Sequence, residues 1–439
     1  MNATDTLRLA VLSSVRAIGP AERRTLFDRA TSIDPVTRDR TAAIVERVRR
    51  HGDDALCALA RELDGVELAV LEVPRERQRE ALERLDPELR RALERAAANI
   101  EAAHRASVPR AVEVETQPGV VVGRRPDPLA RVGVYAPGRR AAYPSSVLMG
   151  AVPARVAGVA EVILCSPPQA DGLPSEVVLA AARLAGVDRV FAVGGAGAIA
   201  AMAYGTASIP RVDRIVGPGN AYVAEAKLQV SGTVAIDSPA GPTELLVIAD
   251  ESADPARIAR EMLAQAEHDP RASVVAVVIG AGVAAHLVAA LESALEAQVR
   301  LPIIIEALAS RGGVLVAADL DEAVRFANEY APEHLLLALA APDRALARIR
   351  NAGTVFLGES SSVVFGDYMT GANHVLPTGG LARSWSGLSV LDFVRWTTWQ
   401  RISPAAAERL ADDVGTVADA EGLPAHTAAA RAWLSGGAR

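Results

Sequence analysis

Two periodicities alternate along this chain and predict its main elements. Up to about residue 109, apolar residues recur at helical spacing, as in TAAIVERV at 41–48. After Arg131, short β-branched runs such as EVILC at 161–165 alternate with helical stretches. Continuous apolar runs of this kind are typical of strands that are buried on both faces of a parallel sheet. The alternation therefore predicts βαβ units and an open parallel sheet covered by helices.

A second set of alternating strands and helices begins at ELLVI, residues 244–248. It includes a predicted helix at 255–267 and predicted strands at 273–279 and 335–339. Beyond about residue 378 the apolar spacing becomes helical again. We therefore expect an α/β fold with two Rossmann-like but incomplete parallel-sheet domains, and with helical N- and C-terminal segments.

Composition and charge exclude several classes of protein. The 439 residues exceed the size at which one core usually keeps growing, so we expect more than one domain. The formal net charge of −7, without a dominant Lys/Arg patch, argues against a nucleic-acid-binding surface. Every apolar run is broken by charge, Gly or Pro, so we expect neither a membrane span nor a signal peptide. With only 2 Cys at distant positions, a reducing cytoplasm is the simplest compartment.

Two polar pairs stand at the ends of predicted elements in the second set. Gln265 and His268 are spaced i, i+3 near the end of the predicted helix, so they share one face and can share an ion. The alternative for His268 is a surface or capping residue. Glu333 and His334 precede a predicted strand, where a carboxylate beside an imidazole is well placed for proton transfer. The alternative for this pair is a loop exposed to solvent.

Further candidates lie in polar loops. Asp367 and His374 fall in a Gly-rich segment without helical or strand pattern, and Glu421 and His426 lie between two predicted helices. Of the 7 His, four lie in loops or at element ends beside acids or amides, which favours a metal or acid–base site. Gly195–Ala200 fits the GxGxxA dinucleotide fingerprint, but a tight turn with close helix packing explains the same residues.

Ordered blocks of sequence carry a resemblance over nearly the whole chain. They are PGRRAAYPSSVLMGAVPARVAGV (137–159), GPGNAYVAEAK (217–227), DSPAGPTELLVIAD (237–250), AQAEHDP (264–270), YAPEHL (330–335), GDYMTGANHVLPTGG (366–380) and AEGLPAH (420–426). In these blocks and their order the chain resembles the histidinol dehydrogenase family. The resemblance implies a zinc-dependent, NAD-linked four-electron oxidation of L-histidinol, through L-histidinal, to L-histidine, the last step of histidine biosynthesis.

The resemblance also implies the roles of individual residues. Glu333 and His334 would be the catalytic acid–base pair. One zinc ion per subunit would be held by Gln265, His268, Asp367 and His426, with the last supplied across a homodimer that shares its active sites and interlocks its C-terminal segments. The implied substrate contacts are Thr243, Gln265, His268, His334, Asp367, His374, Glu421 and His426. The implied NAD contacts are at Tyr135, Gly197 and Asn220.

Three positions depart from the family pattern. Gly197 stands where Gln is usual, so one expected cofactor contact is missing. Arg139 replaces the second Gly of the usual PGG, close to Tyr135. Thr243 stands where Ser is common, and either residue supplies a hydroxyl. The first two departures bear on cofactor affinity and not on the zinc site.

Pattern and resemblance together suggest the domain boundaries. We expect an N-terminal helical segment at 1–25 and a Rossmann-like domain that contacts NAD at 132–243. Residues 26–131 plus 244–383 would form an α/β domain that carries the zinc and acid–base residues. Residues 384–439 would form a C-terminal helical segment that reaches the partner subunit.

In the implied mechanism, His334 is the general base for the alcohol, Glu333 activates the water that attacks the aldehyde, and zinc anchors the substrate. A rival mechanism uses a Cys nucleophile. Cys165 ends a buried-looking strand without a cationic neighbour and Cys57 lies on a helix, so neither position favours a reactive thiolate. Two other functions stay open: a related zinc/NAD dehydrogenase of another small polar alcohol, and a zinc-binding homologue without cofactor.

Overall fold

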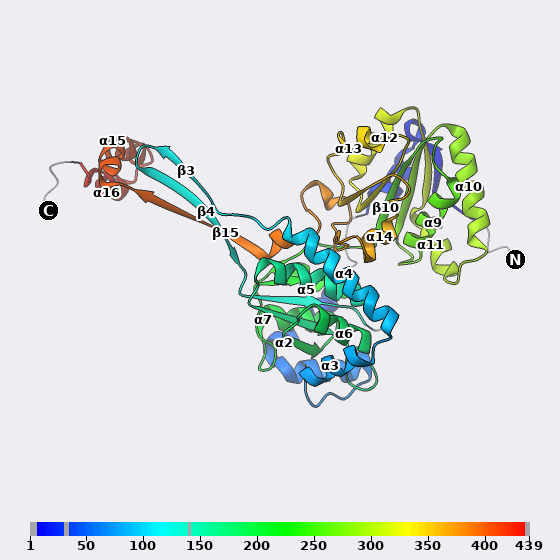
Figure 1. The fold of residues 1–439 in the computed structure, drawn as a ribbon, viewed down its shortest axis with the longest axis horizontal. Coiled ribbons are helices and arrows are strands. Elements are labelled where there is room, and N and C mark those ends of the chain that lie inside the picture. Colours follow the sequence, from blue (N-terminus) through cyan, green and yellow to red (C-terminus); the bar gives the residue numbers. More distant parts are fainter. Residues whose placement is uncertain (1–6, 30–34, 139–141, 435–439) are drawn as a thin grey trace. The chain divides into compact units, whose positions relative to one another are not determined.

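The chain folds into two compact units in a computed structural model that describes residues 7–29, 35–138 and 142–434. The first unit comprises Met1–Ser107 and Leu129–Phe393, and the second comprises Val108–Pro128 and Val394–Arg439. Two six-stranded sheets lie in the first unit and a three-stranded sheet lies in the second (Figure 1). The α/β class with two parallel-sheet halves is therefore confirmed. Arg139 lies outside the described residues.

The first sheet has the strand order β2-β7-β6-β5-β8-β9. Its strands are parallel, except that β2 pairs antiparallel with β7. The predicted run EVILC lies within β6, and Val162 to Cys165 have no exposed surface, as expected of a strand covered on both faces. The strands are β2 (Glu72–Val73), β5 (Arg131–Tyr135), β6 (Glu161–Ser166), β7 (Arg189–Ala192), β8 (Arg214–Val216) and β9 (Ala235–Ile236). The helices between them are α5 (Pro144–Ala157), α6 (Glu176–Leu184), α7 (Gly195–Tyr204) and α8 (Ala221–Val230).

The N-terminal helices pack on this first sheet. They are α2 (Pro35–Leu59), α3 (Arg75–Arg84) and α4 (Pro87–Arg105), which contact α7, α6 and α5 respectively (Figure 1). Residues 26–131 are predicted to belong with the second sheet, whereas α2, α3 and α4 contact helices beside the first sheet. Helical spacing shows that a helix has an apolar face, but it does not show which sheet that face covers.

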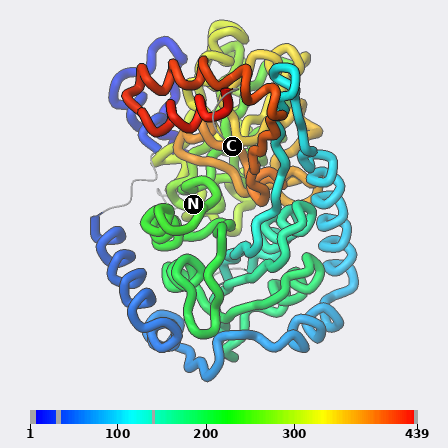
Figure 2. The backbone as a smooth tube through the Cα atoms, turned by 90° about the vertical axis from the view of Figure 1, so that its left-hand side faces the viewer, coloured from blue at the N-terminus to red at the C-terminus, as the bar shows by residue number. Residues whose placement is uncertain are grey.

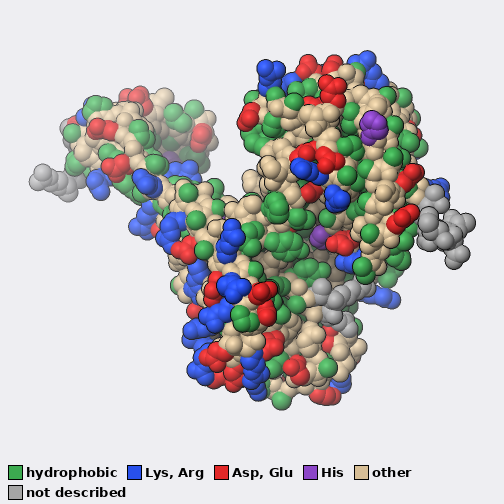
Figure 3. Space-filling view, turned by 45° about the vertical axis from the view of Figure 1, so that its right-hand side comes forward, with side chains coloured by type: hydrophobic (Ala, Val, Ile, Leu, Met, Phe, Trp, Pro, Cys, Tyr) green, Lys and Arg blue, Asp and Glu red, His purple; other side chains and the backbone are tan. Residues whose placement is uncertain are grey.

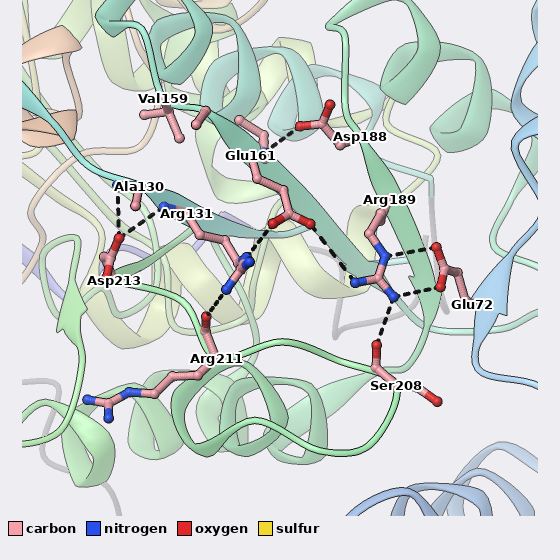
Figure 4. Close-up of polar contacts among 12 residues, drawn as sticks. Glu72, Ala130, Arg131, Val159, Glu161, Asp188, Arg189, Ser208, Arg211 and Asp213 are labelled. Carbon is pink, nitrogen blue, oxygen red and sulfur yellow. Dashed lines mark hydrogen bonds and ion pairs between the residues drawn. The ribbon is translucent and has the colours of Figure 1, made fainter.

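Charged residues at the starts of β5, β6 and β7 pair across the amino edge of the first sheet (Figure 4). Arg131 contacts the carboxylate of Glu161 at 2.5 Å. Arg189 donates two hydrogen bonds to Glu72 of β2, at 2.9 and 2.7 Å. Tyr135 ends β5, so it lies at the opposite edge of the sheet from these pairs.

The second sheet is entirely parallel, in the order β1-β12-β11-β10-β13-β14. Its first strand, β1 (Val11–Ser14), lies in a segment for which we predicted only helix, and that part of the prediction is wrong. Four residues are too few to show a strand period beside helical sequence. The other strands are β10 (Glu244–Ala249), β11 (Ser273–Ile279), β12 (Gly313–Ala317), β13 (His334–Ala338) and β14 (Thr354–Leu357). The helices are α1 (Pro20–Phe27), α9 (Pro255–Ala266), α10 (Ala281–Leu295), α11 (Leu301–Arg311), α12 (Leu320–Tyr330), α13 (Pro342–Leu346) and α14 (Val363–Tyr368).

The second unit is a three-stranded antiparallel sheet with two helices. The strands β3 (Val112–Gln117), β4 (Val120–Pro128) and β15 (Val394–Ile402) pair in the order β15-β4-β3. The helices α15 (Pro404–Ala420) and α16 (Pro424–Arg431) pack against each other (Figure 2). The prediction of a purely helical C-terminal segment is wrong for β15, whose ladder with β4 extends from Val394 to Ile402.

Exposed charges of both signs are interspersed over the face shown in Figure 3. Several exposed ion pairs lie within helices at i, i+4, such as Arg90 with Glu94 at 2.8 Å, and such pairs contribute little to stability individually. Within the described ranges, no helix combines the length and apolarity that a bilayer crossing requires.

Candidate active site

The predicted acid–base residues lie where β10 and β13 begin. These strands are parallel neighbours, with Leu245 opposite His334. Thr243 and Glu333 therefore precede adjacent strands at the same edge of the second sheet. Helix α9 runs back to this edge and ends at Ala266, which brings Gln265 to Thr243. The site is thus built at the amino edge of a parallel sheet, whereas open α/β sheets usually bind ligands at the carboxyl edge.

The Glu333 carboxylate is buried and held by two donors on one oxygen. Its Oε2 accepts a hydrogen bond from the hydroxyl of Thr243 at 2.7 Å and another from the backbone N–H of Glu244 at 2.7 Å. The residue is 6% exposed, so the alternative of a solvent-exposed loop pair does not hold.

His334 has a defined donor nitrogen and a free acceptor nitrogen. Its Nδ1 lies 3.0 Å from the backbone carbonyl oxygen of Glu244, which can only accept, so Nδ1 carries the proton. Its Nε2 lies 3.5 Å from Asp367 Oδ1 and, among the described residues, has no hydrogen-bond partner. Burial alone would lower the pKa of His334, but the carboxylates of Glu333 and Asp367 outweigh burial and raise that pKa well above its ordinary value. These carboxylates therefore stabilise the imidazolium that forms when Nε2 takes up a proton.

The side-chain amide of Gln265 is buried, and one of its two polar atoms has no hydrogen-bond partner among the described residues. Its Oε1 lies 3.0 Å from the hydroxyl of Thr243, which already donates its single hydrogen toward Glu333. Its Nε2 has no partner within the described part of the chain. Amide oxygen and nitrogen are assigned from their surroundings, and the opposite orientation would let Gln265 donate to Thr243. That orientation leaves the amide oxygen free toward the site.

Asp367 and two histidines form the other side of the candidate site. The carbonyl of Asp367 is 2.8 Å from Nδ1 of His374. Burial would raise the pKa of Asp367, but its polar contact with His334 and the charges of His374 and His268 lower it. Burial lowers the pKa of His374. Both predicted histidines therefore lie near enough to the Asp367 carboxylate for their charges to act on it.

The tautomer of His268 suits a metal ligand. Its Nδ1 lies 2.9 Å from the carbonyl of Ala264 on α9 and must donate to it. Nε2 is then the nitrogen with a free lone pair, on an exposed side chain. Metal-bound histidines typically donate their other ring N–H to a carbonyl in this way.

No group of three or more His, Cys, Asp or Glu side chains that could hold a metal occurs among the residues that the structure describes. The predicted ligand set contains only two such residues in the first unit, His268 and Asp367, since Gln265 is an amide. His426 belongs to α16 of the second unit, where it is exposed, as is Glu421 at the end of α15.

The three predicted NAD positions lie at the carboxyl edge of the first sheet. Tyr135 is buried and its Oη accepts a hydrogen bond from the N–H of Gly195 at 3.1 Å. The Asn220 side chain caps α8 by accepting from the N–H groups of Tyr222 and Val223. A Cβ at Gly197 would meet Leu56 and Leu59 of α2 at 3.3 Å. That contact favours close helix packing as the reason for glycine at position 197.

Neither cysteine is placed for nucleophilic catalysis. Cys165 is fully buried in β6, and burial raises the pKa of its thiol. Burial and the nearby Asp53 and Asp54 raise the pKa of Cys57 as well. A thiolate is disfavoured at both positions.

Sequence reasoning missed two buried residues beside the acid–base pair. Glu244 contacts Glu333 and His334 through its own backbone, and Arg29 contacts the Glu244 carboxylate. A charged residue at the head of the apolar run ELLVI was a signal for Glu244. Nothing local indicated Arg29.

Comparison with known proteins identifies relatives over nearly the whole chain. The sequence profile described as histidinol dehydrogenase matches residues 28–434. A histidinol dehydrogenase of Methanosarcina barkeri is 45% identical over 415 residues, covering 94% of this chain and 95% of the relative. One of Natronomonas pharaonis is 50% identical over 416 residues, covering 94% and 97%.

A solved structure supports the same relationship at the level of the fold. The crystal structure of histidinol dehydrogenase from Elizabethkingia anophelis superposes with a TM-score of 0.92 at 33% identity, covering 97% of this chain and 98% of that chain. Because profile, relatives and fold agree from end to end, the chain belongs to the histidinol dehydrogenase family of oxidoreductases.

Proposed function

We propose that this protein oxidises L-histidinol through L-histidinal to L-histidine in the cytoplasm, with zinc and two successive NAD molecules. The observation that carries the proposal is the buried pair at the start of β13. Glu333 is fixed as an acceptor by Thr243 and the Glu244 N–H, and His334 has its tautomer set by the Glu244 carbonyl. A four-electron oxidation needs both a base for a hydroxyl and a base for a water, and these two side chains meet that need.

His334 serves the alcohol stage. Its Nε2 has no hydrogen-bond partner among the described residues, and the neighbouring carboxylates stabilise the imidazolium that forms when Nε2 takes up a proton. In this stage the substrate hydroxyl gives its proton to Nε2, and the carbinol carbon loses a hydride. NAD, when bound, supplies the acceptor for that hydride.

Glu333 serves the aldehyde stage. One water must add to the aldehyde carbon and lose a proton before a second hydride can leave that carbon. The hydrogen bonds to Oε2 hold the carboxylate in one orientation, with Oε1 available to a water. The product carboxylate takes one oxygen from the alcohol and one from this water.

Gln265, His268 and Asp367 fit a zinc site in their donor chemistry. They offer an amide oxygen with no competing partner in one orientation, a ring nitrogen with a fixed tautomer, and a carboxylate whose pKa is lowered. Zinc accepts such nitrogen and oxygen ligands. It would supply an anchor for the imidazole and amine nitrogens of the substrate, with Thr243 and His374 beside it.

The remaining predicted residues complete the proposal. His426 would be the fourth zinc ligand and Glu421 a substrate contact, both contributed by the second copy in a homodimer with shared sites. Tyr135 and Asn220 would line the NAD site at the edge of the first sheet, where Gly197 adds no side chain.

Following NADH formation from histidinol, with and without a zinc chelator, tests the proposal. Histidinol should be oxidised, and chelation should abolish activity while the helical circular dichroism signal stays, since the proposed ligands lie at element ends. Oxidation of another small polar alcohol in preference to histidinol would redirect the substrate assignment. Activity that survives complete zinc removal would overturn the zinc assignment.

A further inference from the structure

Glu244 stands between the two members of the acid–base pair. It is the first residue of β10, and its N–H donates to Glu333 Oε2 at 2.7 Å while its carbonyl accepts from His334 Nδ1 at 3.0 Å. One residue therefore sets the orientation of the carboxylate and the tautomer of the imidazole. Both effects depend on where the backbone of Glu244 lies.

The side chain of Glu244 ties that backbone to two other segments. Its carboxylate accepts a hydrogen bond from the N–H of Gly379 at 2.7 Å and forms an ion pair with Arg29, and both charged side chains are at most 3% exposed. Burial raises the pKa of Glu244 to about 7, against the opposing charge of Arg29. Removing either partner from a buried ion pair leaves the other charge without compensation.

Arg29 reaches the turn that carries Glu333. Its second terminal nitrogen donates to the carbonyl of Tyr330, and its guanidinium lies 3.5 Å from the centre of the Tyr330 ring. Within the described ranges, Ala331 is the one non-glycine residue with a positive φ, at 51°. A left-handed alanine is unfavourable by itself and persists where its surroundings fix it. Arg29 is one of the contacts that hold this turn.

We propose that Glu244 and Arg29 are positioning residues that hold the acid–base pair in its working geometry. The planar guanidinium bridges the Glu244 carboxylate and the Tyr330 carbonyl, so it joins the strand that orients Glu333 and His334 to the turn that bears them. The inference rests on the proposed function, because it assigns these residues to the reaction of Glu333 and His334. No bond to substrate is involved, and neither residue is catalytic.

Charge deletion and charge balance separate positioning from simple stability. In the zinc-loaded full-length enzyme, Glu244→Gln and Arg29→Met should each lower kcat about ten- to a hundredfold with histidinol and with histidinal. The KM of either substrate should change by less than about threefold. The double variant leaves no buried charge uncompensated but also lacks the bridge, so its kcat should stay at least about tenfold below the wild-type value. Glu322→Gln is the matched control. Glu322 is a buried carboxylate on α12, beside the second sheet, and it pairs with Arg16. This variant should keep wild-type kcat.

A spectroscopic measurement tests the geometry independently of turnover. At a pH above the raised pKa of His334, the ¹⁵N NMR signals of this residue, assigned with His334→Asn, should report a proton on Nδ1 in the wild-type protein and a mixed tautomer in Glu244→Gln. If the protein did not oxidise histidinol, the proposed function would fail. The NMR measurement would still show whether Glu244 sets the tautomer of His334. An unchanged His334 spectrum with wild-type kcat in Glu244→Gln would overturn the inference, as would wild-type kcat in the double variant.

Discussion

Glu333 and His334 are adjacent in sequence but offer different acceptors to the site. The carboxylate is fixed through one oxygen by Thr243 and Glu244, and the imidazole is fixed through Nδ1 by the Glu244 carbonyl. Each side chain keeps a second atom for chemistry. In the proposed mechanism, Glu333 therefore serves the water-dependent stage and His334 serves the hydroxyl-dependent stage.

Substituting the two residues separately should split the stages. Glu333→Gln should slow histidinal oxidation more than histidinol oxidation, because only the second stage needs an activated water. His334→Asn should slow the first stage at least as much as the second. Loss of one general acid–base group costs on the order of a hundred- to ten-thousandfold in rate, so supplying histidinol and histidinal separately will show the split. Equal losses on both substrates for Glu333→Gln would mean a structural or electrostatic role.

Thr243 gives a second prediction at this scale. Thr243→Val removes the hydroxyl that donates to Glu333 while keeping the shape, and should lower kcat for histidinal about ten- to a hundredfold. Thr243→Ser is the matched control and should stay near wild type, because its hydroxyl can donate in the same way. A valine variant as active as the serine variant would show that the hydrogen bond does not position the carboxylate.

At the residue scale, the sequence indicated Glu333 and His334 because two titratable groups preceded an apolar strand. It could not indicate the Arg29–Glu244 pair. Those residues are 215 positions apart, and their contact depends on how the segment that follows α1 packs beside β10. Charge pairs over such distances leave no mark in local spacing.

At the scale of elements, the strands with long apolar runs were predictable, whereas β1 and β15 were not. Both β10 and β13 are continuous buried runs, so their sequence indicates them clearly. The strand β1 has four residues, and β15 lies directly before the helical sequence of α15. The helices α2 to α4 were predicted as helices, but their partner sheet was not, because packing partners follow from the tertiary fold.

Substitutions at Gly197 distinguish two roles for this position: close packing against α2, or contact with NAD. Gly197→Gln would direct a side chain at Leu56 and Leu59, so it should lower the free energy of unfolding by about 1–3 kcal/mol and leave the KM for NAD within about twofold. Gly197→Ala is the control, with a smaller loss of stability. A several-fold fall in the KM for NAD with unchanged stability would show instead that this position faces the nucleotide.

At the scale of the whole molecule, the proposal that a homodimer shares its active sites makes a prediction about mixed dimers. We expect His334→Asn and His426→Asn chains each to be inactive alone. Mixed after dissociation, they should regain activity, since a heterodimer of the two would hold one site with both histidines intact. Random pairing gives about half heterodimers, and thus about a quarter of wild-type activity. No recovery in a mixture shown by mass spectrometry to contain heterodimers would contradict shared sites.

The central claim is that one site carries out both oxidation stages, and the number of NADH molecules formed per histidinol consumed tests it most directly. With excess NAD and zinc-loaded enzyme, we expect two NADH for each histidinol, with histidine as the product. One NADH per histidinol with histidinal accumulating, or no NADH at all, would contradict the account.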